Sequence, residues 1–230
     1  MALARPRTGF AWLVAAAIAA APAAADTAAW PDDFVTRLEA QALVQTLNAE
    51  FLATRSATLM LEKWCGDHRL AGPGSATVKA RLLRGEDKPA TAEQRQRLKV
   101  GPDERVNYRR VQLVCGERVL SEADNWYVPA RLTPDMNRLL ETTDTPFGKA
   151  VLDLHFYRQN FAANVLWSPL AEGWEMKPAP AAGAVPAGAL AIPPALFEHR
   201  ALLFTGDGVP FAEVRETYQR ALLDFPLPRP

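Results

Sequence analysis

The stretch "VNYRRVQLVCGERVLSEADNWYVP", residues 106–129, decides the fold. Two runs in which apolar and β-branched residues alternate with polar ones flank a tight turn at Gly116, which is the pattern of an antiparallel β-hairpin. The first run contains two adjacent arginines, Arg109 and Arg110. Because successive side chains of a strand point to opposite faces, these two arginines lie in different environments.

Alternation alone does not decide which of the two arginines is buried. Both faces of the first run are half apolar, as two sets of neighbours show: Arg110 shares its face with Val106, Tyr108 and Val114, and Arg109 shares its face with Val111, Leu113 and Cys115. In a small domain, one of the two arginines is a candidate to face inward, where its charge needs a partner.

The residues before the hairpin predict a long helix, a strand and a short helix. Asp32 or Asp33 can cap a helix whose apolar residues recur at helical spacing, and helical character continues to Trp64. Residues 77–84 alternate as a strand does. A polar stretch follows, in which Thr91 and Gln94 form a capping box that starts a short helix.

The residues after the hairpin predict two short helices, a strand and a second hairpin. Thr133 with Pro134, and Thr145 with Pro146, each place a cap before a proline at the first helical position. The strand lies within residues 154–167, and the last hairpin turns at residues 206–208. This order predicts an α+β fold, with an antiparallel β-sheet flanked by helices in a single domain.

The first 25 residues have the features of a secretory signal peptide. Arg5 and Arg7 precede an apolar stretch that is too short to span a bilayer comfortably, and Ala23 and Ala25 have the spacing that signal peptidase requires. We therefore expect cleavage near Ala25, export to the periplasm, no stable membrane span after removal of the signal, and a mature domain at residues 26–230. Residues 168–195, rich in Pro and Ala, are expected to form a loop within that domain.

The composition is that of a globular protein with a real core, at 49% hydrophobic and 23% charged residues. Without residues 1–25 the chain has 24 basic and 26 acidic residues, a net charge of −2. The basic residues are dispersed along the chain and form no stripe, so we expect no nucleic-acid partner. The oligomeric state does not follow from the sequence.

Cys65 and Cys115 are the only cysteines, and an even number in an exported chain favours a disulfide, with two buried free thiols as the alternative. The three histidines are scattered and share no ligand spacing, so we expect no metal site. The sequence has no phosphate-binding glycine loop, G-x-S-x-G or H-E-x-x-H motif.

Two carboxylates of the last strand are the candidate acids. Glu216 shares a face with Ala212, Val214 and Tyr218, whereas Glu213 lies on the other face. A carboxyl group among apolar neighbours can hold a proton and donate it, which a solvated surface acid does not do. The alternative interpretation is that each carboxylate is solvated or forms a salt bridge and has no catalytic role.

The ordered set of motifs "YRRVQLVCGERVL", "ADNWYVP", "TPFG" and "RETY" resembles the chorismate lyase family, whose fold is shared by the UTRA effector-binding domains of bacterial repressors. The resemblance runs from about Ser56 to Tyr218 and implies a chorismate lyase/UTRA-like fold. It also implies removal of pyruvate from chorismate, or from a related acid, to leave 4-hydroxybenzoate, in a reaction that needs no cofactor or metal.

Carried over by residue, the resemblance implies that Arg110 holds a substrate carboxylate and that Glu216 acts as the acid, with Glu213 as its rival. Three pocket positions depart from the family pattern: Ala57 stands where Met is expected, Phe147 where Leu is expected, and Asn125 where Arg is expected. These departures bear on the identity of the substrate more than on the fold.

Two functions follow as expectations. The first is a carbon–oxygen lyase of the chorismate lyase type, although an exported lyase would need an exported substrate. The second is a non-catalytic periplasmic protein that binds a small aromatic or cyclohexadienyl carboxylic acid. A third, less favoured hypothesis is a structural protein that uses the Pro/Ala-rich loop as a contact surface.

Overall fold

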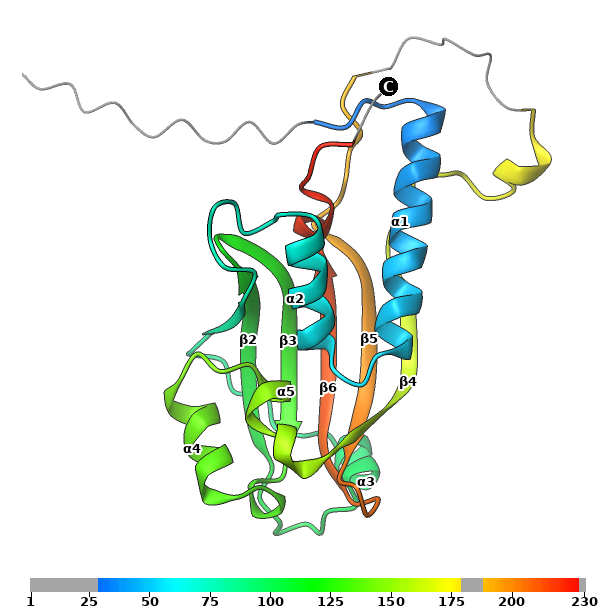
Figure 1. Ribbon diagram of the computed structural model, residues 1–230. Coiled ribbons are helices and arrows are strands. Elements are labelled where there is room, and N and C mark those ends of the chain that lie inside the picture. Colours follow the sequence, from blue (N-terminus) through cyan, green and yellow to red (C-terminus); the bar gives the residue numbers. More distant parts are fainter. Residues whose placement is uncertain (1–28, 179–187, 228–230) are drawn as a thin grey trace, which may run out of the picture.

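A single antiparallel sheet forms the centre of the protein (Figure 1). The computed structural model describes residues 29–178 and 188–227. The six strands lie in the order β1-β2-β3-β6-β5-β4, and their bounds are β1 (Val78–Leu82), β2 (Asn107–Cys115), β3 (Arg118–Tyr127), β4 (Tyr157–Val165), β5 (Ala195–Phe204) and β6 (Pro210–Gln219). With its helices, this sheet confirms the predicted α+β class.

The helices are distributed unequally between the two faces of the sheet. In Figure 1, α1 (Phe34–Ala53), α2 (Ala57–Asp67) and α5 (Phe147–Ala150) lie in front of the sheet, and α4 (Pro134–Thr142) lies beside the lower end of β2. The opposite face carries α3 (Ala92–Leu98), which packs against β6. One face is therefore broadly covered, and much of the other stays polar.

Most helix starts agree with the sequence signals. The side chain of Asp33 caps α1, Thr91 and Gln94 form the predicted capping box of α3, and Thr133 caps α4 with Pro134 at its first position. The expectation of Thr145 as a cap is wrong by one residue, because Pro146 takes the N-cap position of α5. Helix ends are the least certain part of such predictions.

The expected continuous helix from Phe34 to Trp64 is also wrong. The chain leaves the helix at Thr54, which has an extended backbone, and starts α2 at Ser56, whose side chain accepts a hydrogen bond from the Leu59 amide. The Ser side chain offers the backbone an alternative to helical bonding, which explains the break. The break places the N-terminus of α2 over the middle of the sheet (Figure 1).

The main core lies between α1, α2 and the sheet. Val44, Leu47 and Phe51 of α1 are fully buried, and the Phe51 ring lies 4.1 Å, centroid to centroid, from the ring of Tyr218 on β6. Burying one such side chain contributes about 1.5–3 kcal/mol. This packing fixes the inward face of β6, which carries Tyr218 and Glu216.

A disulfide joins Cys65 of α2 to Cys115 of β2, as predicted from the even number of cysteines. Both residues are fully buried. The turn after Cys115 needs glycine, because Gly116 has a φ of +56° and a Cβ there would lie 3.1 Å from the Ala71 carbonyl oxygen. The disulfide bond fixes α2 to the end of β2.

Two sequence predictions fall wholly or partly outside the described residues. The expected signal peptide at residues 1–25 lies outside them entirely. Of the expected loop at residues 168–195, the described parts contain one short 3₁₀ turn, Trp174–Met176, and residues 179–187 lie outside. No helix in the described parts of the chain is long and apolar enough to cross a membrane.

Candidate functional site

The candidate site is built around Glu216, near the middle of β6. Its cross-strand neighbours are Ala123 on β3 and His199 on β5, so it lies deep within the sheet. The side chain points toward α2 and α5, together with those of Val214 and Tyr218, and the residue is 7% exposed. A carboxylate buried this far requires a charged or hydrogen-bonding partner.

Arg158 of β4 is that partner. Its Nη2 atom lies 2.6 Å from Oε2 of Glu216, and the side chains of Arg158 and Glu216 are 3% and 9% exposed. Burial is the largest single influence and lowers the pKa of Arg158, but the interactions with Glu216 and Tyr218 together raise the pKa by more, so the guanidinium keeps its charge. The site therefore contains a buried ion pair whose two members come from different strands.

Tyr218 completes the polar group on the inward face of β6. Its hydroxyl donates a hydrogen bond of 3.2 Å to Oε2 of Glu216. Burial raises the pKa of Tyr218 far above its ordinary value, and the Glu216 carboxylate adds to this effect. The phenol thus stays protonated and remains a donor.

His199 lies behind this group, on β5. It is fully buried, and its Nε2 atom lies 2.7 Å from Oδ1 of Asn48 on α1. Burial, with a smaller contribution from the nearby Arg158 guanidinium, lowers the pKa of His199 to about 4. The imidazole is therefore neutral at ordinary pH and adds no charge to the site.

Arg158 and Glu216 both line a cavity between the sheet, α2 and α5. Phe147 and Gly148 of α5 form one wall of it, and Ser56, Ala57 and Thr58 at the start of α2 form another. The remaining lining is mostly apolar and comes from Val111, Leu113, Ala123, Asn125, Phe156, Leu203 and Val214. Water has access to about 30 Å³ of it, which is room for one or two molecules.

Arg55 marks the opening of this cavity. It lies in the exposed connection between α1 and α2 and lines the cavity beside Ser56. Within the described residues, no side chain lies at ion-pair distance from its guanidinium. A second positive charge therefore stands at the entrance, next to the N-terminus of α2, where backbone amides also favour an anion.

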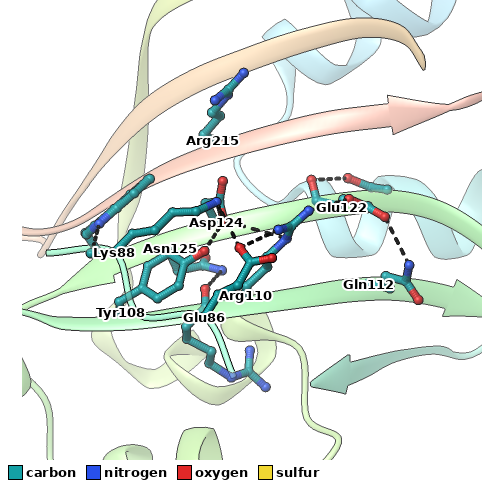
Figure 2. A network of polar contacts seen from close by, with 12 residues as sticks. Glu86, Lys88, Tyr108, Arg110, Gln112, Glu122, Asp124, Asn125 and Arg215 are labelled. Atoms are coloured by element: carbon teal, nitrogen blue, oxygen red, sulfur yellow. Dashed lines mark hydrogen bonds and ion pairs between the residues drawn. The ribbon is translucent and has the colours of Figure 1, made fainter. Parts of the chain in front are cut away.

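The sequence prediction that Arg110 points inward is wrong, as Figure 2 shows. Its guanidinium lies on the opposite face of the sheet, with Nη1 2.6 Å from Glu86 and Nη2 3.1 Å from Glu122. Asp124, which accepts a hydrogen bond from Tyr108, lies directly across the strand pair from Arg110. Three carboxylates on that face provide the partners that decide the orientation.

Arg109 is the inward arginine and is 6% exposed. Its Nε atom donates to the Leu140 carbonyl at the end of α4, and its Nη2 atom donates to the Thr145 carbonyl, each at 3.0 Å. Burial lowers its pKa to about 10. Arg109 therefore supports the end of α4 and does not line the cavity.

The structure separates the two candidate acids. Glu213 is fully buried on the opposite face of β6, where Arg97 and Gln94 of α3 and Arg200 of β5 donate to it. Glu216, in contrast, lines the cavity together with Ala57, Asn125 and Phe147, the three pocket positions named from the sequence. The structure thus brings four of the predicted residues together and excludes Arg110 and Glu213.

Arg158 was missed by the sequence reasoning. In "YRQNF" it stands between two exposed residues, and a single arginine in such a strand is ordinarily solvated. The signal that could have found it is its alternation with Phe156, a buried residue that lines the same cavity. In residues 29–178 and 188–227, no group of three His, Cys, Asp or Glu side chains could hold a metal.

The fold and the site define an α+β protein with a buried Arg–Glu pair in an apolar cavity, and the comparisons place it in a family. The protein named "Uncharacterized protein y4mC" of Sinorhizobium fredii is 53% identical over 199 residues, which cover 86% of this chain and 83% of that protein. The chain belongs to the same family as y4mC. No family profile matches it.

Solved structures show weaker similarity. The possible transcriptional regulator YydK of Bacillus subtilis is 17% identical, with 66% of this chain and 62% of that chain covered and a TM-score of 0.39. The ligand-binding domain of a putative GntR-family regulator from Bordetella bronchiseptica is 18% identical, with 62% and 83% covered and a TM-score of 0.40. At these values, nothing about function follows from the similarity.

Proposed function

We propose that this protein binds a small carboxylic acid in the cavity lined by Arg158 and Glu216. The observation that carries the proposal is a guanidinium only 3% exposed that faces an otherwise largely apolar cavity. A buried guanidinium is the group best suited to hold a carboxylate, because its planar fork can donate two parallel hydrogen bonds. Arg55 at the entrance attracts an anion to the site.

An aromatic or cyclohexadienyl ring suits the rest of the cavity. Phe147 and Phe156 offer ring faces, and Val111, Leu113 and Val214 offer branched apolar surface. The present free volume of about 30 Å³ is too small for a ring, so entry requires Phe147 or the start of α2 to move. The break between α1 and α2 at Thr54 gives that wall a place to bend.

In this proposal Arg158 takes the role that the family resemblance gave to Arg110. The residue changes because Arg110 faces the other side of the sheet, whereas Arg158 reaches the same acid, Glu216, from β4. The proposal retains export to the periplasm after removal of residues 1–25, and a periplasmic protein of this kind would bind an acid from outside the cytoplasm. Export is supported by the sequence pattern alone.

The test is calorimetric titration of the purified protein with 4-hydroxybenzoate. Saturable binding to one site is expected, and Arg158→Met should weaken it about 10- to 100-fold, the value of a hydrogen bond to a charged group. Arg110→Met is the matched control and should leave the affinity unchanged, since its side chain lies on the other face. An equal loss in both variants would contradict the proposed site.

A second candidate function is the lyase reaction, and the position of Glu216 favours it. A Glu216 side chain that holds a proton, beside the ligand's carboxylate partner, can donate that proton to an ether oxygen as a carbon–oxygen bond breaks. Incubation with chorismate should then yield pyruvate and 4-hydroxybenzoate in equal amounts. Glu216→Gln should abolish this turnover and Glu213→Gln should not, and binding without products would leave the protein as a binder only.

A further inference from the structure

The cavity's cation already has a counter-ion. Arg158 is paired with Glu216 at 2.6 Å, and Tyr218 donates to the same carboxylate, so the charge of Arg158 is balanced without a ligand. If a ligand's carboxylate reaches Arg158, it and the Glu216 carboxylate lie beside the same guanidinium and repel each other. Both lie where water has little access, so their repulsion is weakly screened.

Among the described residues, no further charged side chain lines the cavity to relieve this repulsion. The charged residues that line it are Arg55, Arg158 and Glu216, and Arg55 is exposed to solvent, which screens its charge. The polar groups that α2 and β3 add to the lining are neutral: the hydroxyls of Ser56 and Thr58 and the side chain of Asn125. Behind the lining, Asn48 and His199 are neutral, and Glu62 of α2 and Lys149 of α5 neutralise each other at 2.6 Å.

We propose that a carboxylic acid binds in this cavity together with one proton, which Glu216 takes up as the ligand's carboxylate replaces it as the counter-ion of Arg158. The inference rests on the proposed binding function and specifies its ligand: an acid that enters with one negative charge and leaves the site's net charge unchanged. The proton comes from solvent, and no covalent bond is made or broken.

Protonation changes what Glu216 offers to the ligand. An ionised carboxylate only accepts hydrogen bonds, whereas a protonated one also donates. The site with ligand bound would thus present one donor from Glu216 toward the cavity, and it favours acids that carry an acceptor oxygen away from the carboxylate. Affinity should fall about tenfold for each unit of pH above neutrality, because each bound ligand requires one proton.

Calorimetry tests this with 4-hydroxybenzoate as the probe. Titrations at one pH in phosphate and in Tris, whose ionisation enthalpies differ strongly, give the number of protons taken up per ligand. A value near one is expected for the unaltered protein, with an affinity about tenfold weaker at pH 8 than at pH 7. Binding with equal heats in both buffers would overturn the inference while leaving the binding function intact.

Two variants assign the proton to a residue. Glu216→Gln should abolish proton uptake and make the affinity independent of pH, whereas His199→Gln should retain an uptake near one, because His199 does not line the cavity. Loss of uptake only in His199→Gln would overturn the assignment to Glu216. If Glu216→Gln does not fold, the two-buffer titration of the unaltered protein still decides whether a proton is taken up with the ligand. Absence of binding in every buffer would remove the proposed function itself, and the inference with it.

Discussion

Glu213 and Glu216 stand three residues apart on β6 and face opposite sides of the same sheet. Both are buried and both are paired with arginine, yet their surroundings differ. Glu213 accepts hydrogen bonds from Arg97 and Gln94 of α3 and from Arg200, and α3 covers it. Glu216 has one arginine and one tyrosine hydroxyl, and its remaining side opens onto a cavity.

A buried carboxylate can therefore serve structure or function, depending on its neighbours. Glu213 is surrounded by hydrogen-bond donors and cannot accept a bond from a ligand. Two of these donors belong to α3, so Glu213 fixes α3 to the sheet. Glu216 has one cation as its partner and lies beside an apolar cavity, so the carboxylate of another acid can replace it at Arg158. Three variants test this contrast between Glu213 and Glu216.

The largest effect is expected from removing the disulfide that fixes α2, one wall of the Glu216 cavity. Replacing both Cys65 and Cys115 by Ala opens a loop of 50 residues and should lower the free energy of unfolding by roughly 4 kcal/mol. Denaturant unfolding measures this loss. Ligand affinity should fall as well, because α2 can then move relative to β2. An unchanged unfolding free energy would show that the bond does not constrain the chain.

The next effect concerns Glu213 itself. Glu213→Ala leaves Arg97 and Arg200 without their buried partner and should lower stability by about 3 kcal/mol, while binding at the other face stays unchanged. Asp135→Ala is the control, since Asp135 and Arg138 form an exposed pair with side chains 81% and 68% exposed, and should change stability by about 0.5 kcal/mol or less. Lost binding in a folded Glu213→Ala variant would contradict the separation of the two faces.

A smaller effect is expected from His199, on the Glu216 side. Its pKa of about 4 in the folded protein lies below the ordinary value of 6.5, so the unfolded chain binds a proton first as the pH falls. The stability contribution of the neutral imidazole is present above pH 6.5 and decreases toward pH 4, by about 2 kcal/mol at pH 5. His199→Gln should flatten the unfolding free energy over this interval. An identical pH profile in the variant would contradict the buried, neutral state.

Local signals in the sequence predicted most of the elements. Gly116 between two alternating runs predicted the hairpin, and Thr133 with Pro134 predicted the start of α4. These features depend on neighbours within a few residues, so they can be read from one stretch of chain. The break at Thr54 was missed because helical spacing resumes directly after it.

The site was only partly predictable, because its partners are distant in sequence. Period-two alternation placed Arg109 and Arg110 on opposite faces, but the choice between the faces depends on Glu86 and Glu122, 24 and 12 residues from Arg110. Arg158 reaches Glu216 only because β4 and β6 flank β5 in the sheet. The strand order therefore decides which arginine meets which acid.

A crystal structure of the protein grown with 4-hydroxybenzoate would show whether Arg158 holds the ligand's carboxylate. We expect the ligand's carboxylate within about 2.7–2.9 Å of the Arg158 guanidinium, with its ring against Phe147. Glu216 should lie on the same side of the cavity, no longer the sole partner of Arg158. A ligand bound elsewhere, such as against Arg110 on the open face, with the Arg158–Glu216 pair unchanged, would contradict it.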